Sequence, residues 1–156
     1  MEIEKKFLVD TLPEDLAGYD VWEIEQHYLC AEPTIRIRKK NEQFILTYKS
    51  HIPMPEDSLC VAEETELPLT EEAFVHLREK CDGQGIRKTR YRLPYHQWTI
   101  ELDVFHGRHE GFVLAEVEFA TVEESRTFIP PDWFGREVSG DIRYANSVLA
   151  GVRLQK

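Results

Sequence analysis

The strongest constraint on the fold is a charge pattern that recurs in strand-like segments. Eight segments alternate apolar and polar side chains with a period of two, which is the period of a β-strand. They span residues 2–9, 23–29, 34–39, 43–49, 61–67, 86–93, 97–105 and 112–119. In the clear strands one face is apolar. The other carries charges that are mostly of one sign within a strand, as in Arg36 and Arg38 or Glu116 and Glu118.

A solvated sheet face would explain any one of these charged strands, but it explains the whole set poorly. Solvated faces usually mix both signs with uncharged polar residues. Like charges two positions apart repel, and this repulsion is tolerable where the charges face a wet interior that binds counter-charges. Eight antiparallel strands can close into a barrel, and interior and exterior positions then alternate along every strand.

We therefore predict an α+β, mainly β fold. It is an eight-stranded antiparallel closed barrel, or tunnel, whose interior holds roughly eight acids and six or seven bases. The apolar faces lie outside and are covered by a few helices. Helices are expected over residues 70–81, with Thr70 as N-cap, over residues 122–128, and from Ser139 or Asp141 to Ala150.

The length of 156 residues predicts a single domain over 1–156. With 19 basic and 29 acidic residues the net charge is −10, which argues against nucleic acid and an anionic membrane as partners. No apolar run approaches a membrane span, and no signal-peptide core is seen. Cys30, Cys60 and Cys81 are odd in number and scattered, so we expect reduced thiols in a cytoplasmic protein.

A tunnel with both signs of charge suits one class of ligand. Clustered arginines and lysines bind phosphate, and clustered carboxylates bind hard divalent cations such as Mg²⁺ or Mn²⁺. The two together in one cavity indicate a metal-complexed polyphosphate. Phosphoryl transfer needs this equipment, because it depends on positioning and charge stabilisation.

The charged segments of the chain, taken in order, resemble those of a known family. The segment Glu2-Ile3-Glu4-Lys5-Lys6 is similar to the E-x-E-x-K signature of the CYTH domain, the triphosphate tunnel metalloenzyme superfamily. Later blocks follow in the family's order along essentially the whole chain: 35–38 (IRIR), 46–49 (LTYK), 64–66 (ETE), 87–91 (RKTRY), 101–105 (ELDVF), 116–119 (EVEF), 131–135 (PDWFG) and 143–144 (RY).

The resemblance implies an eight-stranded β tunnel and a role for each inner charge. The bases would bind the substrate phosphates: Lys6, Arg36, Arg38, Lys49, Lys88 and Arg90. The acids of the first and last strands would hold Mg²⁺ or Mn²⁺: Glu2, Glu4, Glu116 and Glu118. Secondary candidates for the metal, or for orienting the bases, are Glu64, Glu66, Glu101 and Asp103.

The catalytic residues that the resemblance implies are Tyr28, Lys6 and Glu4. Tyr28 stands in Gln26-His27-Tyr28-Leu29, where small bacterial-type members carry a candidate proton-accepting tyrosine in Q-x-Y-L. A phenol close to lysines and arginines ionises more easily than a free one. A purely structural strand tyrosine remains the alternative. Members with this pattern often carry glycine in place of His27, and the sequence leaves open whether His27 points inward.

Small members of this length resemble inorganic tripolyphosphatases. The preferred interpretation is metal-dependent hydrolysis of tripolyphosphate to pyrophosphate and phosphate. The alternatives are a thiamine triphosphatase, a class IV adenylate cyclase, and a non-catalytic polyphosphate- or nucleotide-binding module. The expected partner is a small-molecule triphosphate, and a homodimer is compatible with the sequence. The role of the C-terminal helix stays open, because a role as a basic plug rests on Arg143 alone.

Overall fold

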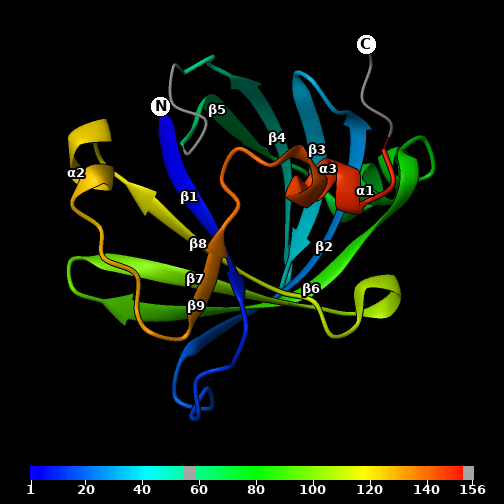
Figure 1. The fold of residues 1–156 in the computed structure, drawn as a ribbon. Coiled ribbons are helices and arrows are strands. Elements are labelled where there is room, and N and C mark those ends of the chain that lie inside the picture. Colours follow the sequence, from blue (N-terminus) through cyan, green and yellow to red (C-terminus); the bar gives the residue numbers. More distant parts are fainter. Residues whose placement is uncertain (55–58, 153–156) are drawn as a thin grey trace.

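The computed structural model describes residues 1–54 and 59–152, and they form a closed β-barrel (Figure 1). The barrel strands are β1 (Glu2–Val9), β2 (Asp20–Cys30), β3 (Thr34–Lys40), β4 (Gln43–His51), β5 (Cys60–Pro68), β6 (Asp82–Tyr95), β7 (Trp98–Phe105) and β8 (Val113–Phe119). A ninth strand is β9 (Phe134–Glu137). The helical elements are α1 (Glu71–Arg78), η1 (Gly107–His109), α2 (Val122–Arg126), η2 (Ile142–Tyr144) and α3 (Asn146–Leu149).

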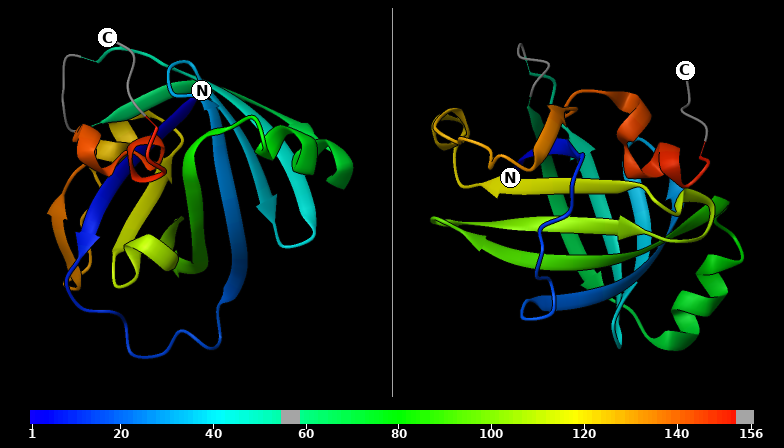
Figure 2. Two further views of the ribbon diagram at one scale, coloured as in Figure 1. Left: turned by 90° about the vertical axis from the view of Figure 1, so that its right-hand side faces the viewer. Right: turned by 60° about the horizontal axis from the view of Figure 1, so that its bottom comes forward.

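All strand pairs are antiparallel, and the order is β5-β4-β3-β2-β6-β7-β8-β1-β9, with a further pairing of β5 with β1. That pairing closes the barrel through three residue pairs, from Glu2↔Ala62 to Glu4↔Cys60. The rest of this edge of β1 is available to β9, which pairs with it at Phe7↔Glu137 and Val9↔Phe134. The expected eight-stranded antiparallel barrel is confirmed, with β9 as an addition (Figure 2).

The larger of two apolar clusters lies outside the barrel, as predicted. The larger cluster joins the outer faces of β1, β7 and β8, including Ile3, Leu102 and Val117, to Phe128. The neighbouring ring of Phe134 packs against Phe7 with centroids 4.8 Å apart. In Figure 1 the segment from α2 to β9 crosses this side of the barrel, and α1 and α3 lie on the other side. A second cluster, which includes Phe105, Leu114 and Ala150, lies where α3 meets the barrel. Phe105 and Leu114 are each two residues from an inward-facing acid on their strands, so this cluster fills one end of the interior.

The C-terminal helix is shorter than predicted. In place of one helix up to Ala150, the chain forms the 3-10 turn η2 and the four-residue helix α3. The two are separated by Ala145, whose ψ of 137° is extended and interrupts the helical hydrogen bonds. The helix over 122–128 ends earlier, at Arg126, and the helix over 70–81 ends at Arg78. Its N-cap is confirmed, because Thr70 Oγ1 accepts a hydrogen bond from Ala73 N at 3.1 Å.

Two glycines near the start of β6 allow other parts of the chain to approach closely. Gly83 has a φ of +70°, and a Cβ there would stand 2.3 Å from the carbonyl oxygen of Ala150. The adjacent Gln84 N donates to that oxygen at 2.9 Å. Gly85, with a φ of +73°, leaves the space in which the His27 ring lies. These contacts extend β6 to Asp82, four residues before the predicted start, and they hold α3 at one end of the tunnel.

No helix within the described ranges has the length and the apolar run that crossing a bilayer takes.

Candidate functional site

The barrel interior holds a charged cavity of about 300 Å³. A volume at the lower end of the range for ligand sites suits a small molecule. Seven acids and seven bases line it, so the predicted excess of acids on the inner face is wrong for the cavity itself. The acids are Glu2, Glu4, Glu64, Glu66, Glu101, Glu116 and Glu118, and the bases are Lys6, Arg36, Arg38, Lys40, Lys49, Arg90 and Arg92.

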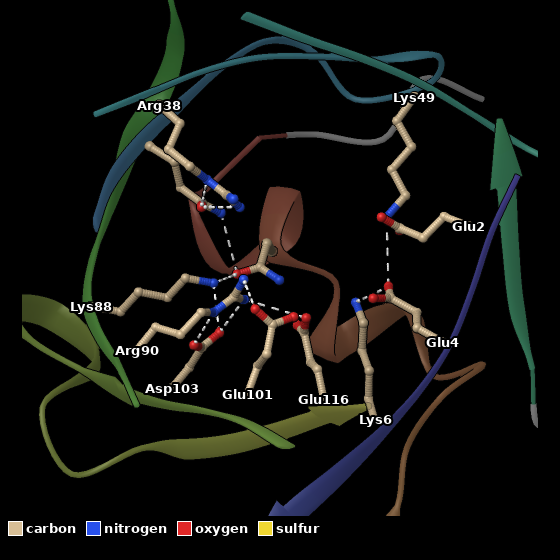
Figure 3. A network of polar contacts seen from close by, with 12 residues as sticks. Glu2, Glu4, Lys6, Arg38, Lys49, Lys88, Arg90, Glu101, Asp103 and Glu116 are labelled. Atoms are coloured by element: carbon tan, nitrogen blue, oxygen red, sulfur yellow. Dashed lines mark hydrogen bonds and ion pairs between the residues drawn. The ribbon is translucent and has the colours of Figure 1, made fainter. Parts of the chain in front are cut away.

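Strand order divides these charges between two halves of the wall. Strands β4, β3, β2 and β6 are consecutive and supply bases and neutral polar groups, whereas β7, β8, β1 and β5 supply all seven acids. Lys6 on β1 is the one base of the acidic half among the lining residues of the described chain. Figure 3 shows Arg38 and Lys49 facing Glu116 and Glu4 across the lumen, with the C-terminal segment behind them.

In the basic half, Arg36 and Arg38 are buried or half-buried without a carboxylate partner in the described part of the chain. Arg36 donates from Nη2 to Thr47 Oγ1 at 3.2 Å, and its buried Nε has no hydrogen-bond partner. Arg38 donates from Nε and Nη2 to Gln26 Oε1 at 3.1 and 2.9 Å. Burial first, and then the neighbouring Arg36 and Arg90 cations, lower the pKa of Arg38 to about 10. Two adjacent cations without a counter-ion leave room for an anion between them.

Gln26 connects this arginine to the candidate catalytic tyrosine. It is fully buried, and its Nε2 donates to Tyr28 Oη at 2.8 Å and to Asn146 Oδ1 at 3.3 Å. Tyr28 lines the cavity at the end where Ala145, Asn146 and Ser147 also line it. The amide therefore orients both Arg38 and Tyr28, and the start of α3 covers this end of the lumen.

His27 points away from the cavity. Its Nε2 lies 2.7 Å from Glu25 Oε2, and its ring lies against Gly85 on the outer face of β2. The question left open by the sequence is therefore answered: His27 points outward, and its side chain is only 15% exposed.

In the acidic half, Glu2, Glu64 and Lys49 form a tight group at the β1–β5 seam. Lys49 Nζ donates to Glu2, and it lies 3.6 Å from Glu4 Oε1 and 4.0 Å from Glu64 Oε2. Burial, and then hydrogen bonds with Glu2 and Glu66, raise the pKa of Glu64 to about 8. Burial also opposes ionisation of Glu2, but the hydrogen bond from Glu64 and the Lys49 cation hold its pKa below the ordinary value. Glu64 thus keeps a proton that it shares with Glu2.

The acids of β7 and β8 differ in how fully they are neutralised. Burial opposes ionisation of Glu116, but Lys6 and Arg90 outweigh it and hold its pKa well below the ordinary value. Arg90 Nη2 lies 3.4 Å from Glu116 Oε2. For Glu118, burial and then the charges of Glu2 and Glu101 raise the pKa. Glu118 has no ion pair among the described residues, so it is the acid of the predicted metal set that is most in need of a cation.

Two predicted site residues are buried inside the barrel beside the cavity and do not line it. Lys88 and Asp103 have fully buried side chains, and Lys88 Nζ donates to Asp103 Oδ2 at 2.7 Å. Arg90 donates to the same carboxylate from Nε at 2.7 Å and from Nη2 at 2.9 Å. Lys88 also bonds Asn146 Oδ1 at 3.1 Å. Lys88 and Asp103 thus support Arg90, which does face the lumen, and a direct Lys88–phosphate contact stays a prediction that this placement does not favour.

Several lining residues are absent from the predicted site, among them Trp22, Lys40 and Arg92. The positions of Trp22 and Lys40 follow from the same alternation, because Trp22 is six residues before the cavity-lining Tyr28 and Lys40 is two residues after Arg38. The predicted strand over 23–29 begins one residue after Trp22, and the predicted strand over 34–39 ends one residue before Lys40. Arg92 was placed on the charged face but lay outside the blocks that carry the family resemblance. Gln26 and Asn146 were missed because uncharged amides carry no signal in a charge pattern.

The donor set suits a hard divalent cation. Among residues 1–54 and 59–152, no three acidic, histidine or cysteine side chains stand ready-arranged around one point. The retained proton on Glu64 and the unpaired Glu118 mark carboxylates that a cation would satisfy. Oxygen donors of this type bind Mg²⁺ or Mn²⁺, and Mg²⁺ sites are commonly completed by substrate phosphates. The residues therefore fit an ion that is held jointly by the acids and a phosphate ligand.

Comparison with known proteins points in the same direction. The chain is 38% identical over 155 residues to an inorganic triphosphatase of Nitrosomonas europaea, covering 96% of each chain. It is 35% identical over 150 residues to an inorganic triphosphatase of Acetivibrio thermocellus, covering 95% of this chain and 92% of the relative. No family model matches the sequence.

Among solved structures, that of an inorganic triphosphatase matches with a TM-score of 0.70 and 32% identity, covering 100% of this chain and 97% of the other. A Hippeastrum protein described as a putative adenylyl cyclase with dominant triphosphatase activity matches with a TM-score of 0.57 and 17% identity, covering 81% and 83%. At that identity the second match shows a shared fold alone.

Proposed function

Because the chain belongs to the inorganic triphosphatases of the triphosphate tunnel metalloenzyme (CYTH) superfamily, we propose that it hydrolyses inorganic tripolyphosphate to pyrophosphate and phosphate. One observation in the site carries the substrate assignment. Arg36 and Arg38 occupy adjacent inner positions of β3 and have no carboxylate partner in the described chain, and one guanidinium nitrogen is buried and unbonded. Burying such cations is costly unless an anion joins them. A small polyanion in a cavity of about 300 Å³ meets that need.

The other charged residues of the cavity can be assigned roles in binding phosphate and metal. Lys49, Lys6 and Arg90 already have carboxylate partners, so they would bind phosphate oxygens while those carboxylates turn to a metal ion. Glu118, Glu64 and Glu2 are the acids best suited to hold Mg²⁺ or Mn²⁺, with Glu4 and Glu116 beside them. When bound, the ion neutralises phosphate charge and polarises the reacting phosphoryl group.

Hydrolysis requires a water oxygen to bond to a terminal phosphorus while the anhydride oxygen leaves with pyrophosphate. We assign Tyr28 as acceptor of the water's proton. Its Oη lines the cavity and already accepts a hydrogen bond from Gln26, which fixes the direction of its free lone pair. Lys6, which lies 3.8 Å from Glu4, would neutralise charge on the leaving group. Burial lowers the pKa of Lys6, but Glu4 and Glu116 outweigh it and raise the pKa, so the ammonium stays charged.

A cytoplasmic location is part of the same proposal. Cys30, Cys60 and Cys81 are all free, which is usual in a reducing compartment.

The test is phosphate release from tripolyphosphate, ATP and thiamine triphosphate, each with Mg²⁺, with Mn²⁺ and with chelator. We expect tripolyphosphate to be the best substrate and chelator to abolish turnover. Arg38→Gln should weaken tripolyphosphate binding about tenfold or more, since it removes a charge-assisted contact. Lys39→Gln is the matched control, because Lys39 is the next residue on β3 and its ammonium lies over the outer-face Phe44 ring.

Other outcomes would replace the proposal. Formation of cyclic AMP from ATP, faster than phosphate release from tripolyphosphate, would indicate a cyclase. Preference for thiamine triphosphate would show that the site recognises an organic group in addition to the phosphates. Tight calorimetric binding of tripolyphosphate without release under either metal would indicate a binding module.

A further inference from the structure

Three residues at the mouth of the cavity, Trp22, Lys40 and Arg92, form a cluster that hydrolysis of a triphosphate does not use. Lys40 Nζ lies 4.0 Å from the centre of the Trp22 ring, and the Arg92 guanidinium carbon lies 4.6 Å from it. All three line the cavity. They stand where β2 begins and where β3 and β6 end, at the opposite end of the tunnel from the start of α3.

The cluster continues two rows of bases. Along β3 the inner positions are Arg36, Arg38 and Lys40, and along β6 Arg90 is followed by Arg92. Alternate residues of a strand are about 7 Å apart, so each row gains one further cation toward the solvent. Trp22 lies on β2 between the two rows, and its ring attracts both cations.

The two cations lack adequate counter-charges. Lys40 forms no ion pair in the described part of the chain. Arg92 forms an ion pair with the exposed Asp20, at 3.9 Å. The Nε of Arg92 is buried and has no hydrogen-bond partner. The aromatic ring orients these groups but supplies no hydrogen-bond acceptor in its plane, so the site is complete only with an anionic acceptor.

We propose that this cluster is an additional phosphate subsite, which lets the tunnel accept linear polyphosphates of four or more phosphates. The inference rests on the proposed function, since it lengthens the phosphate-binding row of the same cavity. A nucleobase stacked on Trp22 is less well supported, because two cations already lie against that ring and a base would have to displace one of them. The occupant that uses all three residues as they stand is a further phosphate group.

The experiment compares tetrapolyphosphate with tripolyphosphate in the wild type and in Lys40→Gln and Arg92→Gln. Both KM and calorimetric Kd, the latter with a metal that does not support turnover, are measured for each ligand. Lys39→Gln, from the outer face of β3, and Arg87→Gln, from the exposed face of β6, are the matched controls. Intrinsic fluorescence of the wild type, against Trp22→Phe, reports occupancy of the mouth directly.

We expect each cavity variant to weaken tetrapolyphosphate about fivefold while changing tripolyphosphate less than twofold, as for one partly exposed charge contact. Tetrapolyphosphate, and not tripolyphosphate, should alter the Trp22-dependent fluorescence. The subsite would be overturned if the variants weakened the binding of both ligands equally or of neither. It would also be overturned if they weakened the binding of ATP and left that of tetrapolyphosphate unchanged. If no substrate is hydrolysed but the binding difference persists, the proposed hydrolysis fails and the subsite stands.

Discussion

Asp103→Asn removes one negative charge from between two cations, Lys88 and Arg90, that are buried inside the barrel. The Asp103 carboxylate accepts hydrogen bonds from Arg90 at 2.7 and 2.9 Å and from Lys88 at 2.7 Å. Removing one partner of a buried ion pair typically costs about 3–5 kcal/mol, because the remaining charge stays desolvated. Asparagine keeps the shape and one acceptor oxygen, so we expect about 3 kcal/mol.

The measurement is urea unfolding at pH 7 without ligand. With a slope of about 2 kcal/mol per molar urea, the midpoint should fall by about 1.5 M. Glu110→Gln is the control, because it makes the same change in net charge at a residue whose side chain is 73% exposed. Its midpoint should move by less than about 0.3 M, the size of an ordinary surface substitution.

The pH dependence of unfolding distinguishes the loss of the Asp103 charge from a change in side-chain packing. Burial, only partly offset by Asp103, lowers the pKa of Lys88 to about 8, below its ordinary value of 10.5. A lysine with a lowered pKa binds fewer protons in the folded state, so stability rises with pH between the two values. Without Asp103 the pKa of Lys88 falls further, so the rise in the variant's stability begins at a lower pH. The gap between variant and wild type should therefore be narrower at pH 9 than at pH 6. A constant gap, or a loss below about 1 kcal/mol at pH 7, would refute the charge argument.

Three further predictions concern the lumen. Glu4→Gln should reduce metal-dependent phosphate release far more than the urea midpoint, and unchanged turnover would remove Glu4 from the site. Glu64 has a folded pKa of about 8 against 4.5 when unfolded, so its contribution is present below 4.5 and is lost as pH rises through 8. In chelator, melting temperatures of Glu64→Gln should therefore fall less than those of the wild type between pH 5 and 9, and parallel profiles would contradict this. Tyr28→Phe should lower kcat about 100-fold or more if Tyr28 accepts the proton, while destabilising the fold by only about 1 kcal/mol. Wild-type kcat in this variant would leave Tyr28 as a structural residue.

Strand alternation made most of the fold and of the charged wall predictable. The first strand was predicted with the bounds that it has, and Thr70 was predicted as the helix cap that it is. Both depend on local rules, namely a period of two and a side chain that bonds the free N–H groups of a first turn. The inner positions of Arg36 and Arg38 followed from the same period.

What escaped prediction depends on contacts between distant segments. β9 is four residues long and exists because β1 has an unpaired edge beyond its three-pair contact with β5. The burial of Lys88 inside the barrel depends on Asp103 and Asn146, which are 15 and 58 positions away in sequence. No local pattern distinguishes such a lysine from Arg90, the next inward residue. The proton shared by Glu2 and Glu64 likewise appears only once the barrel closes.

The position of the apolar core bears on how such an enzyme can change. In most small barrels the interior is the core, so reshaping a ligand site disturbs the packing that holds the fold together. Here residues such as Ile3 and Val117 pack outside, on the opposite face of the strands that carry Glu4 and Glu116 inside. Substitution of a lumen residue that faces water therefore leaves the packed layer intact. Such a change can alter activity with a smaller loss of stability than is usual. Groups such as Lys40 and Trp22 can be exchanged one at a time, so a single scaffold can evolve toward different phosphorylated substrates by successive small steps.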